Sequence, residues 1–247
     1  MTGMEEYQAF MREEVAAAAG PGADVEVRCL DHAVVSGKGL SSSEALELPS
    51  LLRSVAGAVA AGAEAVAIAN GFDPGLWQAR ELFDVPVLGL FETVAFYGLR
   101  MGARLGVLCS GRNGPARIQE LLCRYGIAAR FARPRSLGIG VPAVMSAFED
   151  DHAYERIADE IGQALKLLGA DGAELTLIAS GALGALIRSR RLDETTTMPV
   201  LSNVPILVQE LVAAAALSRL GVPAVSRLGR FAAAPDVVRD GLLAPSP

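Results

Sequence analysis

A ten-residue pattern occurs twice in this chain, and it limits the possible folds more than any other feature. Residues 62–71 read GAEAVAIANG and residues 172–181 read GAELTLIASG, so six of the ten positions are identical at a constant offset of 110. The sequence PVL at residues 86–88 follows the first copy, and the same sequence at residues 199–201 follows the second. Because the flanking elements also repeat, duplication is favoured over chance similarity between Ala- and Gly-rich segments. The pattern predicts two similar halves.

Short apolar runs alternate with segments of helical periodicity along the whole chain. Strands are expected at residues 24–30, 65–69, 86–90, 105–108, 175–179, 198–201 and 223–227. Helices are expected at residues 4–19, 43–61, 75–82, 92–101, 115–125, 152–168, 184–191 and 205–220, with Ser41 to Ser43 capping the second. Residues 133–142 are interpreted as a long loop. The order predicts an α/β fold with mostly parallel sheets, its halves related by a pseudo-two-fold axis.

The first half is expected to comprise residues 1–100, with residues 216–247 packing back on it, and the second half residues 101–215. A chain of 247 residues with 51% hydrophobic residues can bury a substantial core. Ligands of parallel α/β sheets bind beyond the carboxyl ends of the strands. We therefore expect the active site in a cleft where the two halves meet.

Composition argues against several classes of function. A formal net charge of −6 does not suit a surface for duplex nucleic acid. The one dense basic group, Arg188 with Arg190 and Arg191, is interpreted as a solvated helix end. Three cysteines and two histidines form no CxxC motif or Cys/His cluster, so neither disulfides nor a metal site is expected. The sequence shows no signal peptide and no uninterrupted membrane-length apolar run, which predicts a cytoplasmic protein without membrane contact.

Asn70 and Ser180 occupy equivalent positions at the ends of the repeated strands. If the halves pack symmetrically, these side chains face one small molecule and can stabilise a carbonyl or enolate oxygen. Cys109 follows another expected strand, either as a catalytic thiol or as an inert buried residue. The catalytic candidates are thus Asn70, Ser180 and Cys109. The candidates for substrate binding are Gly71, Phe72, Ser110, Gly181, Ala182 and Asn203.

Other polar residues are given simpler interpretations. Asp73, which precedes Pro74, is expected to be a turn and capping residue. His152 lies at a charged helix start and is expected on the surface. His32 follows an expected strand and could approach the mouth of the site.

Several stretches resemble the hydantoin racemase branch of the aspartate/glutamate racemase superfamily. They are NGFDPGL at residues 70–76, AR at 79–80, VPVLG at 85–89, DGAE at 171–174, MPV at 198–200 and SRLG at 226–229. The resemblance spans about residues 40–235, and its Asp-Pro-Gly-Leu portion is the most specific. It implies two α/β halves, a homo-oligomer, and chemistry without a cofactor at a carbon next to a carbonyl.

In that family two cysteines face the substrate carbon from opposite sides, and the matching positions here are Asn70 and Ser180. Neither side chain is a base at neutral pH. The resemblance implies a racemase or isomerase of a small amino-acid derivative, hydantoin-like cyclic amide or dicarboxylate. The alternatives are a lyase or hydrolase using Ser180 or Cys109, and a non-catalytic binding protein. The family also begins with a strand and an Asn-rich loop, so either the true start lies upstream or the first half lacks a central strand.

Overall fold

The computed structural model of the protein describes residues 4–30 and 40–243. Within this part, two separate sheets are formed by strands β1 (Val66–Ile68), β2 (Val87–Gly89), β3 (Leu105–Cys109), β4 (Arg135–Ser136), β5 (Leu175–Ile178) and β6 (Val200–Leu201). The smaller sheet has the order β1-β2 and the larger one β4-β3-β5-β6. Every pair within them is parallel. The expected α/β fold with parallel sheets is confirmed.

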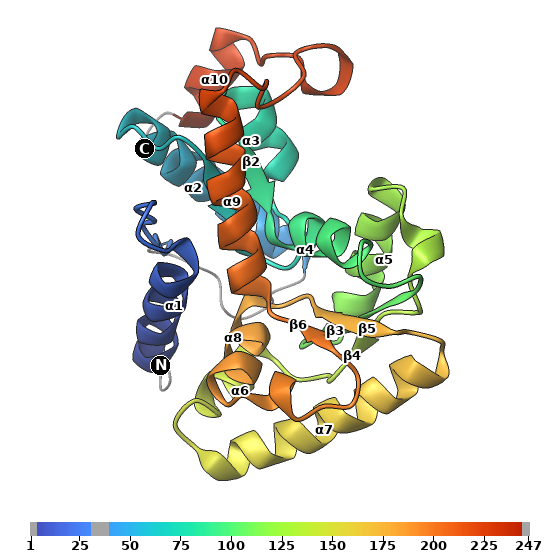
Figure 1. The fold of residues 1–247 in the computed structure, drawn as a ribbon. Coiled ribbons are helices and arrows are strands. Elements are labelled where there is room, and N and C mark those ends of the chain that lie inside the picture. The colour runs from blue at the N-terminus through green and yellow to red at the C-terminus, as the bar shows by residue number, and fades with distance from the viewer. Residues whose placement is uncertain (1–3, 31–39, 244–247) are drawn as a thin grey trace.

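Helices surround both sheets. They are α1 (Met4–Ala19), α2 (Ser41–Ala60), α3 (Leu76–Leu82), α4 (Leu90–Gly98), α5 (Gly114–Arg124), α6 (Val141–Ser146), α7 (Asp151–Ala170), α8 (Gly181–Ser189), α9 (Asn203–Arg219) and α10 (Asp236–Leu243), with short 3₁₀ turns at Ala128–Arg130, Leu192–Glu194 and Gly229–Phe231. In Figure 1, α7 lies below the larger sheet, and α10 lies at the opposite end of the molecule with α2 and α3. Helix α9 runs between these ends and contacts α1, α4 and β1.

The correspondence between the halves extends well beyond the repeated decapeptide. Helices α2 and α7 both have 20 residues, and both of their ends are offset by 110 positions. Helices α1 and α5 begin at Met4 and Gly114, which is the same offset. Strand β1 corresponds to β5 and β2 to β6. The two halves therefore share the order of these elements, whereas β3, β4 and α6 have no counterpart among the described residues of the first half.

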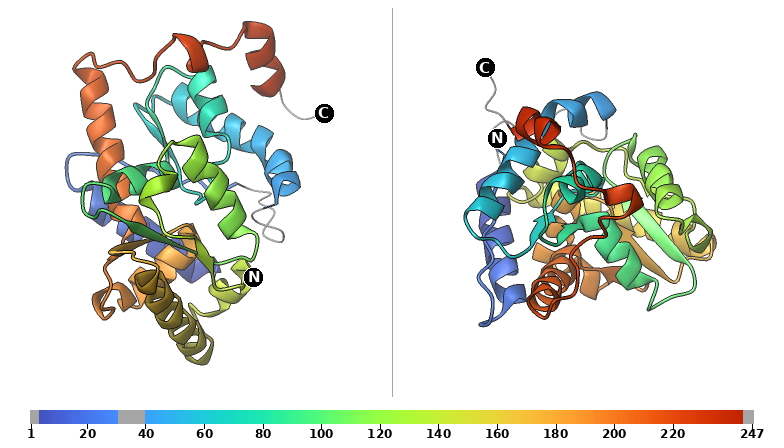
Figure 2. Two further views of the ribbon diagram at one scale, coloured as in Figure 1. Left: turned by 90° about the vertical axis from the view of Figure 1, so that its right-hand side faces the viewer. Right: turned by 90° about the horizontal axis from the view of Figure 1, so that it is seen from above.

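The core is built around the larger sheet, whose central strands β3 and β5 are buried at every position. Alternate side chains serve opposite faces, as expected for a strand. Val107 packs with apolar residues of α4 and α5, whereas Leu108 packs with those of α7 and α8. Figures 1 and 2 show these helices on the two sides of the sheet. Burial on both faces explains why these strands are continuous apolar runs.

Two of the expected strands are wrong. Residues 24–30 form no strand, and Val25 and Val27 instead join an apolar cluster with residues of α1 and α9. No strand in the described part of the chain pairs with this segment, and an alternating pattern without a paired neighbour does not form a ladder. Residues 223–227 also lack strand structure. There, the Arg227 guanidinium donates to the carbonyls of Arg80 and Phe83.

Two smaller expectations also need correction. Ser41 to Ser43 lie inside the first turn of α2, and Leu40 occupies the capping position without a side-chain hydrogen bond. The expected loop at 133–142 contains β4, which pairs with the end of β3, and the first residues of α6. Such short elements are determined by tertiary packing rather than by local pattern.

The residues after α9 pack on the helices of the first half. Arg230 forms an ion pair with Glu81 of α3, and the Ala234 amide donates to the Glu81 carbonyl. Helix α10 contacts α2. The division of the chain at residues 100/101 and 215/216 stays a prediction. No helix in residues 4–30 or 40–243 combines the length and apolarity needed to cross a membrane.

Candidate active site

The loops that follow β1 and β5 touch each other through equivalent residues. A Cβ placed on Gly71 would lie 2.4 Å from the carbonyl carbon of Ala179 and 2.8 Å from the amide nitrogen of Ser180. In the reciprocal contact, a Cβ on Gly181 would lie 3.2 Å from the carbonyl oxygen of Ala69. The glycines permit this close approach because they have no side chain. The loop pair formed by residues 69–72 and 179–182 is the candidate active site.

Asn70 uses one side-chain atom to shape its own loop. Its Oδ1 accepts a hydrogen bond of 3.0 Å from the Phe72 amide, which is an Asx turn. The residue is half-buried. No hydrogen bond from its Nδ2 to another described residue is found. Within the described part of the chain, neither of the two N–H donors of this amide group is engaged.

Ser180 has the equivalent arrangement in the second half. It is the N-cap of α8, and its Oγ accepts a hydrogen bond of 3.2 Å from the Leu183 amide. The hydroxyl proton has no acceptor among the described residues, and the residue is half-buried. The helix terminus adds a positive partial charge at this point. Both loops thus use an acceptor atom for local structure, and in both the side-chain donor has no partner in residues 4–30 or 40–243.

Asp73 connects the first loop to the start of α4. Its φ of 46° is a left-handed conformation, and its buried carboxylate accepts hydrogen bonds from the Phe91 and Glu92 amides at 2.9 and 2.8 Å. The Tyr125 hydroxyl donates a third, also of 2.8 Å. Burial raises the pKa of Asp73 to about 7, against the lowering effect of these bonds. Asp73 is therefore a turn residue that caps α4, in agreement with the interpretation from sequence.

The structure does not place Cys109 where the catalytic hypothesis needs it. Its side chain is fully buried among apolar residues of the core, and a Cβ on Gly114 would lie 2.9 Å from its Sγ. Burial raises the pKa of the thiol to about 12. This burial favours the alternative of an inert core residue, because side-chain alternation in β3 directs Cys109 toward α5.

The other expected binding residues divide into two groups. Gly71, Phe72, Gly181 and Ala182 belong to the loop pair itself. Ser110 and Asn203 are 8% and 5% exposed, so they offer little surface to a ligand. Asn203 donates to the Ile178 carbonyl at 2.7 Å and packs against Gly184 beneath α8. It therefore fastens α9 to β5, and its expected contact with substrate does not agree with this placement.

Two side chains that were not expected at the site approach the loop pair from helices. The Tyr7 hydroxyl of α1 would lie 3.8 Å from a Cβ on Gly181, and the Arg117 guanidinium of α5 lies 5.9 Å from the centre of the Phe72 ring. Positions 7 and 117 are again separated by 110 residues. Extending the repeat upstream into the helices would have identified them, but the two residue types share no chemistry that suggests equivalence.

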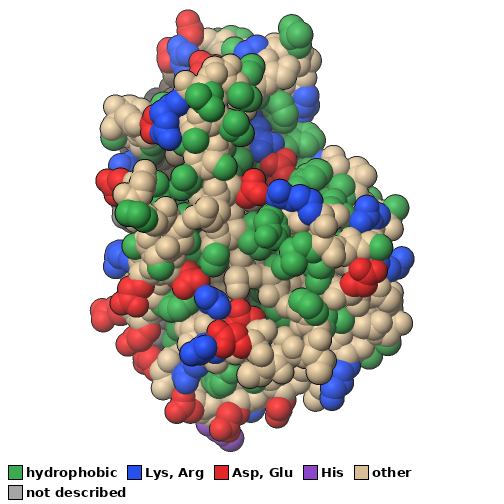
Figure 3. All heavy atoms as spheres, viewed as in Figure 1, with side chains coloured by type: hydrophobic (Ala, Val, Ile, Leu, Met, Phe, Trp, Pro, Cys, Tyr) green, Lys and Arg blue, Asp and Glu red, His purple; other side chains and the backbone are tan. Residues whose placement is uncertain are grey.

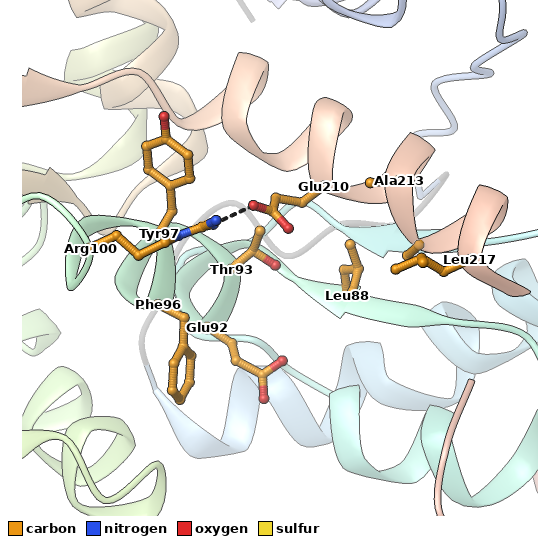
Figure 4. A pocket seen from close by; sticks show the side chains of 10 residues that line it. Leu88, Glu92, Thr93, Phe96, Tyr97, Arg100, Glu210, Ala213 and Leu217 are labelled. Carbon is orange, nitrogen blue, oxygen red and sulfur yellow. Dashed lines mark hydrogen bonds and ion pairs between the residues drawn. The ribbon is translucent and has the colours of Figure 1, made fainter. Parts of the chain in front are cut away.

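A hollow of about 220 Å³ lies elsewhere, between α4 and α9. Leu88, Phe96, Tyr97 and Leu217 provide its apolar wall, and an ion pair joins Arg100 to Glu210 across it (Figure 4). Figure 3 shows hydrophobic side chains gathered on this face of the molecule. The hollow is thus built from the helix that follows β2 and the helix that follows β6, not from the loop pair.

The remaining candidates are not at the loops or cannot be placed. His152 is exposed at the start of α7, and His32 lies outside the described residues. Arg188 and Arg190 pair with Glu14 and Asp151, so they do not form a free basic surface. Among residues 4–30 and 40–243, no three His, Cys, Asp or Glu side chains gather in a way that could hold a metal ion.

Comparisons with known proteins agree with this architecture. The chain is 27% identical over 168 residues to a hydantoin racemase of Rhizobium meliloti, covering 68% of this chain and 67% of that protein. It is 27% identical over 163 residues to a hydantoin racemase of Pseudomonas sp. (strain NS671), covering 65% of this chain and 62% of that protein. The matched region thus spans about two thirds of these relatives.

Similarity to a solved structure covers more of the chain. An allantoin racemase from Klebsiella pneumoniae superposes with a TM-score of 0.76 and 25% identity, covering 92% of this chain and 89% of that one. The family model described as Asp/Glu/Hydantoin racemase matches residues 4–211, which include both loops and both sheets. The chain is a racemase-like enzyme, and it belongs to the Asp/Glu/hydantoin racemase family.

Proposed function

We propose that the protein labilises the C–H bond next to a carbonyl of a small hydantoin-like cyclic amide, and so racemises it, at the loop pair of residues 69–72 and 179–182. The observation that carries this proposal is the pair of uncommitted donors. Asn70 and Ser180 each have their acceptor oxygen engaged locally, and neither donates a side-chain hydrogen bond to any residue that the structure describes. Two preorganised donors suit an oxygen that gains negative charge as the C–H bond breaks.

The charge around the loops favours a neutral substrate over a dicarboxylate. Arg117, which packs on Phe72, donates to Glu44 at 2.6 Å and to Ser41 at 3.0 Å. Its positive charge is thereby matched inside the protein. A cyclic amide offers carbonyl oxygens to neutral donors and does not require an unpaired cation. The relatives are named hydantoin racemase and allantoin racemase, and both of these compounds are cyclic amides.

The proton must travel without a thiol at the two strand ends. In the proposed step the electron pair of the C–H bond forms a C=C bond to the carbonyl carbon, the π pair of the C=O bond moves onto oxygen to give an enolate held by Asn70 and Ser180, and the proton passes to water. Return of a proton from water to the opposite face gives the enantiomer. Both residues are only partly buried, which leaves water access to the loops. The side chains lower the barrier by stabilising the enolate, not by serving as bases.

The test follows one enantiomer of 5-benzylhydantoin in D2O by polarimetry and by proton NMR at the ring carbon. We expect optical rotation to decay faster than in buffer, with deuterium replacing the C–H proton at a matching rate. Asn70→Ala and Ser180→Ala should each slow this decay by roughly 10-fold or more, the effect of losing an enolate-stabilising donor, while Cys109→Ala leaves it unchanged. Decay no faster than in buffer would contradict the proposal, and ring opening without racemisation would favour a hydrolase.

A further inference from the structure

Helices α1 and α5 each carry one side chain that lies close to the loop of the opposite half. Tyr7 of the first half reaches Gly181 of the second, and its ring also meets the edge of Phe148 at 5.9 Å between centroids. Arg117 of the second half reaches Phe72 of the first. The two residues are equivalent by the 110-residue offset. The approach of side chains from both helices is therefore a property of the duplicated architecture, and each helix can contribute one group to the site.

Among the described residues, only Arg117 of these two forms side-chain hydrogen bonds within the protein. The Arg117 guanidinium donates hydrogen bonds to Ser41 and Glu44. Tyr7 is half-buried, and its hydroxyl makes no hydrogen bond to any residue that the structure describes. Burial raises the pKa of Tyr7 to about 12, so the phenol stays protonated at neutral pH and is a donor, not a base.

We propose that the Tyr7 hydroxyl binds substrate by donating a hydrogen bond to a carbonyl oxygen of the cyclic amide held at the loop pair. This inference rests on the proposed function. A cyclic amide of the hydantoin type carries two ring carbonyls, one that becomes the enolate and one that does not. Asn70 and Ser180 serve the first of these, and Tyr7, which comes from a separate element, serves the second. Tyr7 is then a residue that selects substrates with two carbonyl groups.

The test replaces Tyr7 by Phe, which keeps the ring and its contact with Phe148. We expect kcat/KM for 5-benzylhydantoin to fall about 3- to 10-fold, the effect of losing one hydrogen bond, mainly through KM. The melting temperature should be nearly unchanged. Tyr154→Phe is the matched control, because it removes the hydroxyl of a tyrosine that lies in α7, where its ring contacts Arg190. Its kinetics should equal those of the wild type.

A second readout separates binding from a structural effect. Replacing one ring carbonyl at a time by a thiocarbonyl, as in 2-thio- and 4-thio-5-benzylhydantoin, weakens the acceptor at a known position. For one analogue the wild type should lose affinity, and Tyr7→Phe should abolish this discrimination. If the wild type racemises hydantoins while Tyr7→Phe has unchanged kinetics and discrimination, this inference fails alone. If the wild type neither binds nor racemises them, the proposed function fails and the inference fails with it.

Discussion

Gly71 and Ala179, which belong to different halves of the molecule, are in backbone contact at the ends of equivalent strands. The space for a Cβ on Gly71 is already filled by the Ala179 carbonyl, 2.4 Å from its carbon and 2.6 Å from its oxygen. The reciprocal pair, Gly181 and Ala69, is also close. This contact fixes the distance between the loops that carry Asn70 and Ser180. Under the proposed function, both glycines are needed to keep Asn70 and Ser180 close enough to bind one molecule.

Gly71→Ala should both destabilise the protein and impair activity. The new methyl group meets backbone atoms, which cannot move aside as a flexible side chain can. We expect a loss of roughly 2 kcal/mol or more in the free energy of unfolding, as for overpacked core positions. Denaturant unfolding measures this loss. Gly162→Ala in α7 is the control, because a Cβ there meets nothing within 4 Å, and it should stabilise by about 0.5–1 kcal/mol. Equal stability of wild type and Gly71→Ala would show that the loops are not in contact.

The buried carboxyl of Asp73 makes stability depend on pH. Its pKa is raised from an ordinary value of 3.8 to about 7 in the folded protein. A raised pKa means that the folded state binds the proton more tightly than the unfolded state. Its contribution to stability is then complete below pH 4 and is lost as the pH rises through about 7. The free energy of unfolding, measured from pH 4 to 8, should fall by less in Asp73→Asn than in the wild type. Asp159→Asn, an exposed change in α7, should keep the wild-type slope, and an unaltered slope in Asp73→Asn would refute the assignment.

Ser180 has two roles that substitution can separate. Ser180→Ala removes the cap of α8 and should cost about 1 kcal/mol of stability. Ser180→Asp retains an acceptor for the Leu183 amide but has no hydroxyl proton to donate at neutral pH. We expect Asp to restore most of the stability and none of the racemase activity. Activity restored together with stability would mean that Ser180 serves only as a cap.

The three cysteines should differ in reactivity toward a thiol reagent. Cys29 and Cys123 are exposed, whereas Cys109 is buried. Burial raises the pKa of Cys109 to about 12, and thiolates are the reactive species. Two thiols should therefore react rapidly in the native protein and the third only after denaturation. Labelling followed by mass spectrometry of peptides identifies them, and rapid modification of Cys109 would place it at the surface.

The sequence alone was sufficient to predict the fold class and the loop pair, because both follow from periodicity and from the repeat. The wrong strands at residues 24–30 and 223–227 have a common physical reason. A local pattern shows that a segment can be a strand, but a strand also needs a neighbour, and pairing is a property of the tertiary fold. The same limit explains why β4 was missed.

The side chains of the site were harder to predict than the loops. Asn70 and Ser180 could be located by the repeat, whereas Cys109 was proposed from its position at a strand end, and both Cys109 and Asn203 are buried. The only sequence signal for Tyr7 is the 110-residue offset from Arg117, and the different chemistry of the two side chains obscures it. Burial and direction of a side chain depend on packing, which one sequence does not display.

The most direct test is a structure of the protein with an enantiomer of 5-benzylhydantoin bound. The ring should lie at the loop pair, with one carbonyl oxygen within hydrogen-bonding distance, about 3 Å, of both the Asn70 amide nitrogen and the Ser180 hydroxyl. The ring carbon that bears the benzyl group should be reachable by water. A ligand bound instead in the hollow between α4 and α9, with the loop pair unoccupied, would contradict the account.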